Sequence, residues 1–145
     1  MTEQLSPLAL QALAVVEESG AIINANHAHP HTIRHKGRID LVTETDIAVE
    51  AFLKERLATL APQAGFLAEE SAEDLSLPDT CWIIDPVDGT TNFAHGLPLT
   101  ATSVAYRLNG EIVLGIVNAP LLRECFIAEK GKGAWRNGER ISVSS

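Results

Sequence analysis

Apolar residues recur at helical spacing near the start of the chain. They fall at positions that lie on one side of a helix and include Leu8, Ala12, Val15, Val16, Ile22 and Ile23. This spacing predicts an amphipathic helix from Pro7 to about Ala25, with Ser6 as its N-cap. The polar stretch from His27 to Arg38 has no periodicity and contains a proline and a glycine. It is predicted to be a loop.

A second helical pattern follows a short piece of sequence IDLV, residues 39–42, which is predicted to be extended. Thr45 is expected to cap this helix, which ends before Pro62. Six apolar residues form its expected buried face: Ile47, Val49, Phe52, Leu53, Leu57 and Leu60. The helix therefore has one side to pack against another element.

The rest of the chain has the pattern of short strands. The candidates are GFLAE from Gly65, CWIID from Cys81, TATSVAYRL from Thr100, EIVLGIVNA from Glu111, ECFIAEKGKGAW from Glu124 and RNGERISV from Arg136. The pair Asn109-Gly110 is typical of a tight hairpin turn. The sequence therefore predicts an α+β fold, a layered α/β sandwich in which two N-terminal helices pack on one face of a largely antiparallel sheet. Neither a repeat nor a low-complexity linker divides residues 1–145, so one domain is expected.

Composition and charge exclude several classes of function. Of 145 residues, 46% are hydrophobic and 21% are charged, with a formal net charge of −8, which argues against broad binding to nucleic acid or to an anionic membrane. No apolar run approaches the roughly 20 residues of a membrane helix, and the first residues do not resemble a signal peptide, so a cytoplasmic protein is expected. Cys81 and Cys125 have no paired spacing and are expected to be reduced and to lie on strands.

The segment WIIDPVDGTTNF, which begins at Trp82, holds the most informative polar residues. Its apolar start reads as a buried strand, and a proline keeps Asp85 out of the helical region at the strand's end. Gly89 permits a tight turn, so the carboxylates of Asp85 and Asp88 and the carbonyl of Val87 can converge on one point. Oxygen ligands of this kind suit Mg²⁺.

The residues after Gly89 point to a phosphate beside this cation. Thr90, Thr91 and Asn92 offer hydroxyls and backbone N–H groups at the expected start of a turn or helix, where phosphate oxygens bind well. The alternative is that DPVDG serves only as a turn, because Asp and Gly are common in turns between strands.

Further acids stand at the ends of other predicted elements. GFLAEES places Glu69 and Glu70 at the end of a strand, and DLVTETD places Asp46 at a helix start. Like charges that are held together in a folded site cost free energy unless cations offset them. A meeting of these carboxylates with those of Asp85 and Asp88 therefore favours a site for more than one metal ion, although Glu70 is equally well explained as a solvated neighbour.

In this order the motifs resemble those of the inositol monophosphatase family, within the lithium-sensitive, Mg²⁺-dependent phosphatases that include fructose-1,6-bisphosphatase. The resemblance rests on DLVTETD from Asp40, FLAEES from Phe66, WIIDPVDGTTNFAHGLP from Trp82 and GKGAWRNGERISVS from Gly131. It runs over nearly the whole chain. It implies the fold of the family's first domain and a phosphomonoesterase that acts on inositol monophosphate or a similar small sugar phosphate.

The resemblance also implies a metal ligand set. Glu69, Asp85 and the Val87 carbonyl would hold a first Mg²⁺, and Asp85 and Asp88 would hold a second, with two or three ions in the complete enzyme. One cation lowers the pKa of the attacking water and another neutralises the phosphate and the leaving alkoxide.

The remaining roles that the resemblance implies concern the substrate and the water. Gly89 and Thr90 would offer backbone N–H groups to the substrate phosphate. The Thr90 hydroxyl and Asp46 would orient and activate the water, and Glu69 would assist. Lys36 corresponds to a lysine of a mobile loop in the family and is a weak candidate, since an ordinary exposed lysine explains it nearly as well.

The chain departs from the family in one respect. Members are much longer and supply another metal-binding aspartate from a Trp-Asp-x-Ala segment in a second domain, whereas here Ile83 follows Trp82 and Arg136 follows Trp135. Residues 1–145 are therefore expected to be the N-terminal metal- and phosphate-binding domain, without the family's C-terminal domain.

Two kinds of alternative function remain open. One is a truncated, non-catalytic module for metal binding or dimerisation. The other is a phosphatase for fructose-1,6-bisphosphate, histidinol phosphate or adenosine 3′,5′-bisphosphate. The resemblance further implies inhibition by Li⁺ and a homodimer whose partners are small phosphorylated substrates, not nucleic acid or membranes.

Overall fold

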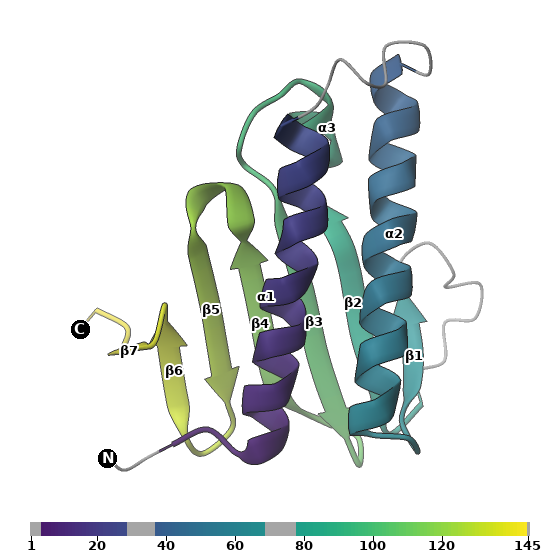
Figure 1. Ribbon diagram of the computed structural model, residues 1–145. Helices are drawn as coiled ribbons and strands as arrows, with labels where there is room; N and C mark the ends of the chain where they lie inside the picture. Colours follow the sequence, from purple (N-terminus) through teal and green to yellow (C-terminus); the bar gives the residue numbers. More distant parts are fainter. Residues whose placement is uncertain (1–3, 29–36, 69–77, 145) are drawn as a thin grey trace.

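The computed structural model describes residues 4–28, 37–68 and 78–144 (Figure 1). The described residues form the helices α1 (Pro7–Ala28), α2 (Gly37–Leu60) and α3 (Thr90–Ala94) and the short 3₁₀ helix η3 (Pro120–Leu122). They also form the strands β1 (Gly65–Ala68), β2 (Cys81–Asp88), β3 (Ala101–Leu108), β4 (Glu111–Ala119), β5 (Glu124–Glu129), β6 (Gly133–Arg136) and β7 (Glu139–Ile141).

The strands form one sheet in which each strand pairs with its neighbour in the sequence, in the order β1 to β7. Only β1 and β2 are parallel, and every other pair is antiparallel. Helices α1 and α2 lie side by side across one face of this sheet (Figure 1). The predicted architecture, two N-terminal helices on a largely antiparallel sheet, is confirmed.

The core lies between the two helices and the sheet. Its fully or almost fully buried apolar side chains come from α1, α2 and strands β2 to β5, and include Ala12, Val16, Ile23, Val49, Leu53, Leu57, Trp82, Ile84, Val104, Tyr106, Leu114, Ile116 and Ile127. Each large side chain that is fully buried contributes about 1.5 to 3 kcal/mol. On the opposite face of the sheet apolar side chains are less covered, and Val117 is 43% exposed.

Helix α1 is long and apolar enough, over Pro7–His27, to cross a membrane by length and composition alone. The expectation from the sequence that no apolar stretch approaches the length of a membrane helix was therefore wrong for this segment. The side chains of Ala9, Ala12, Val16 and Ile23 are nevertheless fully buried against the rest of the fold. The core therefore explains the apolar character of α1.

Helix α2 begins earlier than predicted. Residues 39–42, expected to be extended, are helical, and Thr45 lies inside the helix and not at its start. Thr45 is fully buried and its hydroxyl accepts a hydrogen bond of 2.6 Å from Asn26 Nδ2 of α1. This contact with α1 holds the helix at Thr45, and the helix includes the preceding Ile- and Val-containing segment in spite of its strand propensity. Ile47, assigned to the buried face, is 64% exposed.

The start of α1 is attached to the end of strand β5. Ser6 Oγ accepts a hydrogen bond of 3.2 Å from the Ala9 N–H and caps the helix as predicted. The Glu129 carboxylate on β5 accepts two hydrogen bonds from Ser6, at 2.8 Å from its backbone nitrogen and at 2.6 Å from its hydroxyl. This carboxylate therefore fixes both the cap and the entry of the chain into α1.

Replacement of Glu129 by Gln is expected to lower the free energy of unfolding by about 1 to 2 kcal/mol. The amide has one acceptor oxygen, so one of the two half-buried Ser6 donors loses its partner. Urea denaturation measures this change. Glu139→Gln, on an exposed residue of β7, is the matched control and is expected to change stability by less than about 0.5 kcal/mol. An equal loss in both variants would contradict the assigned role.

Two local predictions are confirmed. Asn109 and Gly110 have φ angles of 51° and 84°, which is the backbone of a tight hairpin turn between β3 and β4. Cys81 and Cys125 are free, buried and on strands β2 and β5. Burial raises the pKa of both thiols, that of Cys125 to about 12 with a smaller contribution from the negative charge of Glu17. Both thiols therefore stay protonated and unreactive at neutral pH.

Candidate active site

Strand β2 runs further into the acidic motif than the sequence suggested. It was expected to end at Asp85, but it continues to Asp88, with Pro86 and Val87 buried. The carbonyl of Pro86 accepts a hydrogen bond of 2.8 Å from Thr102 Oγ1 of β3. A side chain of the neighbouring strand thus holds the segment in place at the residue that has no backbone N–H.

The pairing of β2 with β3 shifts register in this segment. Asp85 pairs with Ser103 and Asp88 pairs with Ala101, so two residues of β2, Pro86 and Val87, stand opposite the single residue Thr102. In a regular strand, residues three apart point to opposite faces. The extra residue of this β-bulge instead puts Asp85 and Asp88 on the same face, with Val87 between them in the chain.

Gly89 turns the chain from β2 into α3. Its φ of 87° and ψ of 38° lie in the left-handed region, and its carbonyl accepts the first helical hydrogen bond of 3.0 Å from the Phe93 N–H. A Cβ atom at this position would lie 2.6 Å from the Leu99 carbonyl oxygen. The Asn92 side chain holds that carbonyl with a hydrogen bond of 2.9 Å. Position 89 therefore requires glycine for two separate reasons, and Thr90 becomes the first residue of α3.

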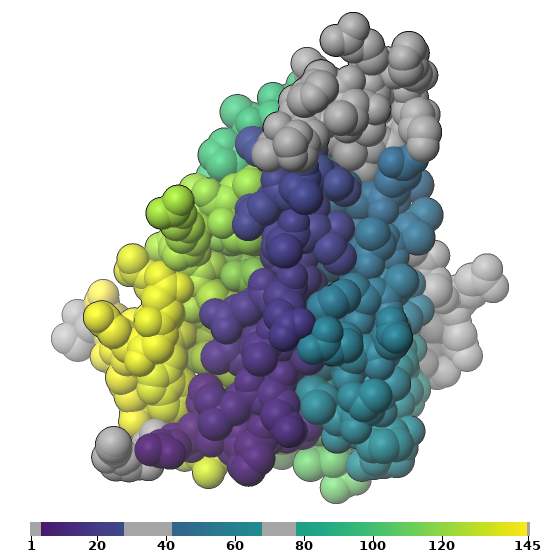
Figure 2. Space-filling model, in the orientation of Figure 1, coloured from purple at the N-terminus to yellow at the C-terminus, as the bar shows by residue number. Residues whose placement is uncertain are grey.

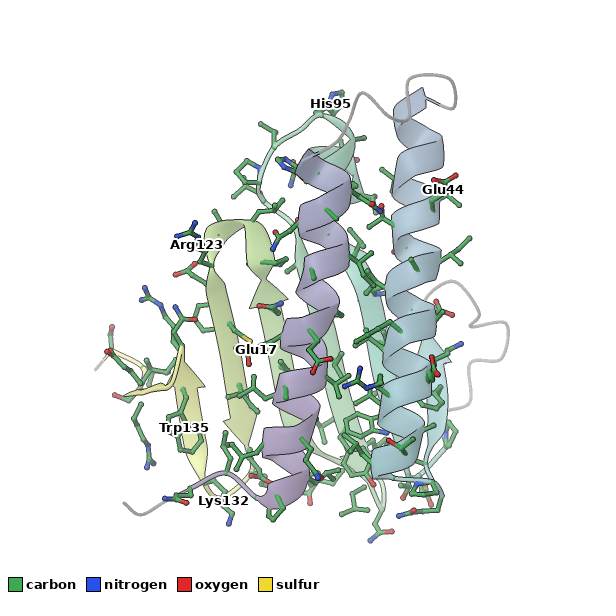
Figure 3. All side chains as sticks on the ribbon, in the orientation of Figure 1. Glu17, Glu44, His95, Arg123, Lys132 and Trp135 are labelled. Atoms are coloured by element: carbon green, nitrogen blue, oxygen red, sulfur yellow. The ribbon has the colours of Figure 1, made fainter. Side chains whose placement is uncertain are left out.

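Asp46 lies on α2 at the same height as the acids of β2. It stands fourteen residues before the end of α2, about 21 Å along the helix axis. From the start of β2, which lies near that end of α2, Asp85 and Asp88 are about 13 and 23 Å along the strand. Glu44, half a turn before Asp46, is seen in the upper half of α2, level with the end of β2 (Figure 3). Helix α2 contacts both β2 and α3.

Asp46 is largely buried and also lines a surface pocket of about 470 Å³. Thr43, Glu50 and Lys54 line the same pocket, and the Glu50 and Lys54 side chains form an ion pair of 2.9 Å. An open surface pocket thus reaches Asp46, the acid of α2 that the sequence singled out. A carboxylate in this position can accept a proton from a water or an alcohol.

The described residues hold only part of the predicted site. Asp46, Asp85, Val87, Asp88, Gly89 and Thr90 are described, whereas Glu69, Glu70 and Lys36 lie outside the described residues. Among the residues that are described, no three His, Cys, Asp or Glu side chains form a group that could hold a metal ion. The roles given to Glu69 and Lys36 therefore stay predictions.

Two supporting residues escaped the sequence analysis. Thr102 donates a hydrogen bond to the Pro86 carbonyl within the bulge. Asn92 was expected only to donate hydrogen bonds to a phosphate, but its side chain also holds the Leu99 carbonyl close to Gly89. Thr102 carries a weak signal in the sequence, because it is a polar residue at a position where the alternation of β3 predicts a buried side chain. The partner of Asn92 depends on the loop that follows α3 and has no local signal.

The sequence as a whole matches known proteins. The model of the inositol monophosphatase family matches residues 4–145. An inositol monophosphatase from Dictyostelium discoideum is 47% identical over 138 residues, which cover 92% of this chain and 51% of that protein. A fructose-1,6-bisphosphatase/inositol-1-monophosphatase from Thermotoga maritima is 47% identical over 105 residues, which cover 72% of this chain and 40% of that protein.

Solved structures show the same likeness in three dimensions. The extragenic suppressor protein suhB from Bartonella henselae is 33% identical, with a TM-score of 0.80 over 97% of this chain and 55% of that chain. The staphylococcal IMPase-II is 26% identical, with a TM-score of 0.82 over 97% of this chain and 51% of that chain. The chain thus spans about half the length of the relatives it matches.

Proposed function

The chain belongs to the inositol monophosphatase family, and on that premise we propose that it serves the Mg²⁺-dependent hydrolysis of inositol monophosphate or a similar small sugar phosphate. The family assignment supports a phosphatase that acts on a small phosphorylated substrate. The observation that carries the proposal is the β-bulge of β2, which puts Asp85 and Asp88 on one face directly before the turn at Gly89.

The donor atoms at the bulge fit Mg²⁺. Asp85 and Asp88 supply carboxylate oxygens on one face, and Val87 lies between them with a backbone carbonyl, so the set is all oxygen, as a hard cation requires. Asp85, Asp88 and the Val87 carbonyl would hold the cation, with Glu69 as the further predicted ligand. When bound, Mg²⁺ supplies Lewis-acid activation of water and neutralisation of phosphate charge.

The chain's own residues have separable tasks. Gly89 lets the backbone turn tightly, so the amides at the start of α3 approach a phosphate oxygen without a side chain between them. The Thr90 hydroxyl and the Asp46 carboxylate orient the attacking water, and Asp46 accepts its proton. The burial of Asp46 keeps this carboxylate within the fold while the adjoining pocket admits water.

Phosphate release from inositol 1-phosphate by the 145-residue chain tests the proposal. We expect release that rises with added Mg²⁺, falls with Li⁺ and stops in EDTA. Fructose-1,6-bisphosphate, histidinol phosphate and adenosine 3′,5′-bisphosphate, assayed in parallel, distinguish the alternative substrates. Equal release in EDTA would contradict the proposal, as would the absence of release from all four esters by a longer protein that contains this chain. Silence of the 145-residue chain, set against activity of such a longer protein, would identify residues 1–145 as a metal-binding half that needs a second domain.

Asp46→Asn is expected to lower kcat about a hundredfold and to leave the Mg²⁺ concentration for half-maximal activity within about twofold of its original value. The amide keeps the shape of the side chain but cannot accept the proton of the water, and general-base catalysis contributes a factor of this order. A Mg²⁺ titration of the rate measures both quantities. The matched control is Glu55→Asn, an exposed position on the same helix. A comparable loss of Mg²⁺ affinity in Asp46→Asn would contradict the role in water activation.

A further inference from the structure

A second concave site of about 500 Å³ lies far from the acids of β2. It is formed by the first half of α1 and by β5, β6 and the turn and strand that follow. In the face shown in Figure 2, the yellow atoms of β6 and β7 stand beside the purple atoms of α1. Strands β3 and β4 separate this pocket from β2. It is therefore distinct from the candidate active site.

The middle of the pocket is apolar. Leu13 of α1, Ile127 of β5 and Trp135 of β6 line it. Ile127 and Trp135 are direct partners across the β5–β6 pair, so their side chains stand next to each other on the face toward α1. Trp135 is only half-buried and Leu10, at the edge of the pocket, is 51% exposed. Part of the Trp135 indole is thus accessible within a concave site.

One end of the pocket is cationic. The Arg140 guanidinium lies over the Trp135 ring, with its central carbon 5.3 Å from the ring centroid. It also fills the space beside Gly133, where the nearest guanidinium atom would be 2.6 Å from a Cβ atom. Gly133 pairs with Glu129, which binds Ser6, so this end lies near the start of α1. The planar fork of arginine suits a carboxylate.

The other end is anionic. Glu17 lies eleven residues after Ser6, about 16 Å further along α1. Figure 3 shows Glu17 on the side of α1 that faces β5, and Trp135 on β6. Cys125, near Glu17, closes the pocket at this end and stays a neutral thiol. The pocket therefore has a positive end, an apolar middle and a negative end.

We propose that this pocket binds a small aromatic monoanion, with its ring against Trp135 between Leu13 and Ile127 and its carboxylate at Arg140. The volume lies within the range of about 300 to 1,000 Å³ that is usual for small-molecule sites. Glu17 sets the direction in which the ligand lies and disfavours a second negative group at the far end of the ring. The inference is independent of the phosphatase chemistry proposed for β2 and α2.

Nuclear magnetic resonance of the two indole N–H groups tests the proposal directly, because the chain has only two tryptophans. Trp135 lines the pocket and Trp82 is fully buried in the core, so Trp82 is an internal control. The probes are 2-naphthoate and the uncharged 2-naphthylmethanol. We expect a saturable shift of the Trp135 resonance alone, with tighter binding of 2-naphthoate. No saturable shift of Trp135, or equal shifts of both indoles, would overturn the proposal.

Matched variants test the charges at the two ends. Arg140→Met is expected to raise the Kd of 2-naphthoate about tenfold and to leave that of 2-naphthylmethanol within about twofold, since a hydrogen-bonded charge pair is lost. Lys132→Met removes the same charge from the exposed turn before β6 and is the control. An equal effect of the two variants would refute a specific contact with Arg140.

A change in the Trp82 resonance would reveal that Arg140→Met alters the fold. In that case Glu17→Gln provides an independent test of the proposal. The original chain is expected to bind naphthalene-2,6-dicarboxylate about fivefold more weakly than 2-naphthoate, because the second carboxylate meets Glu17. In Glu17→Gln that difference is expected to disappear. Persistence of the difference in Glu17→Gln would contradict the proposed orientation.

Discussion

Gly89→Ala is expected to lower the free energy of unfolding by about 3 kcal/mol and to abolish phosphatase activity. The left-handed backbone at φ 87° costs any L-residue with a Cβ about 1 to 2 kcal/mol. The new methyl group would also lie 2.6 Å from the Leu99 carbonyl oxygen, and relief of such a clash costs about 1 to 3 kcal/mol more. Activity is lost because the turn that joins β2 to α3 has to move. Urea denaturation and phosphate release measure the two effects.

Gly96→Ala separates the two causes of this loss. Gly96 has a similar φ of 76°, but a Cβ atom there would have no neighbour within 4 Å. It therefore carries the backbone penalty without the clash, and its expected cost is about 1 to 2 kcal/mol with activity retained. If the free energy of unfolding fell equally in both variants, the close approach of the Leu99 carbonyl to Gly89 would not contribute to the loss. The turn at Gly89 would then not be tightly fixed by that contact.

Local signals in the sequence predicted much of the fold. The strand alternation of β3 and β4 and the Asn109-Gly110 turn fixed the hairpin, because two residues with positive φ define that turn without help from the rest of the chain. The start of α1 followed from Ser6 in the same way. These features depend on neighbours in the sequence, which is why pattern analysis finds them.

The start of α2 and the shape of β2 could not be predicted in this way. Thr45 is a good N-cap residue, but its buried hydroxyl is held by Asn26 of α1, nineteen positions earlier. Pro86 was predicted to end the strand, but β2 continues past it, and Thr102 of β3 donates a hydrogen bond to its carbonyl. Both outcomes depend on contacts between elements that are distant in the sequence, and these contacts outweigh local propensity.

The same distinction applies to the candidate site. From the sequence, Asp85 and Asp88 were predicted to converge because Gly89 permits a tight turn. The structure gives another cause, since the register shift between β2 and β3 places both acids on one face before the turn begins. Without the extra residue of the bulge, regular pairing would put the two carboxylates on opposite faces of the sheet. The two acids could thus be singled out from the sequence, while their placement on one face depends on strand pairing.

Asp85→Asn is expected to reduce phosphate release about a thousandfold or more in saturating Mg²⁺ and to leave the fold unchanged. Asp85 is the acid that the family resemblance assigns to both cations, so the loss of its charge affects each of them. A loss of about 4 kcal/mol of transition-state stabilisation, ordinary for a metal centre, corresponds to that factor. Stability is retained because the amide has the same shape and the half-buried position stays paired with Ser103 across the sheet.

The decisive comparison is with two other acids. Asp79→Asn removes the same charge from an exposed position just before β2 and is expected to leave activity unchanged. Asp88→Asn is expected to weaken activity less than Asp85→Asn and to be partly rescued by more Mg²⁺, since it serves one cation only on this assignment. If raised Mg²⁺ restored Asp85→Asn as fully as Asp88→Asn, the two acids would have equal roles. Asp85 and Asp88 would then be equivalent ligands. The assignment of Asp85 to both cations and of Asp88 to one cation would be wrong.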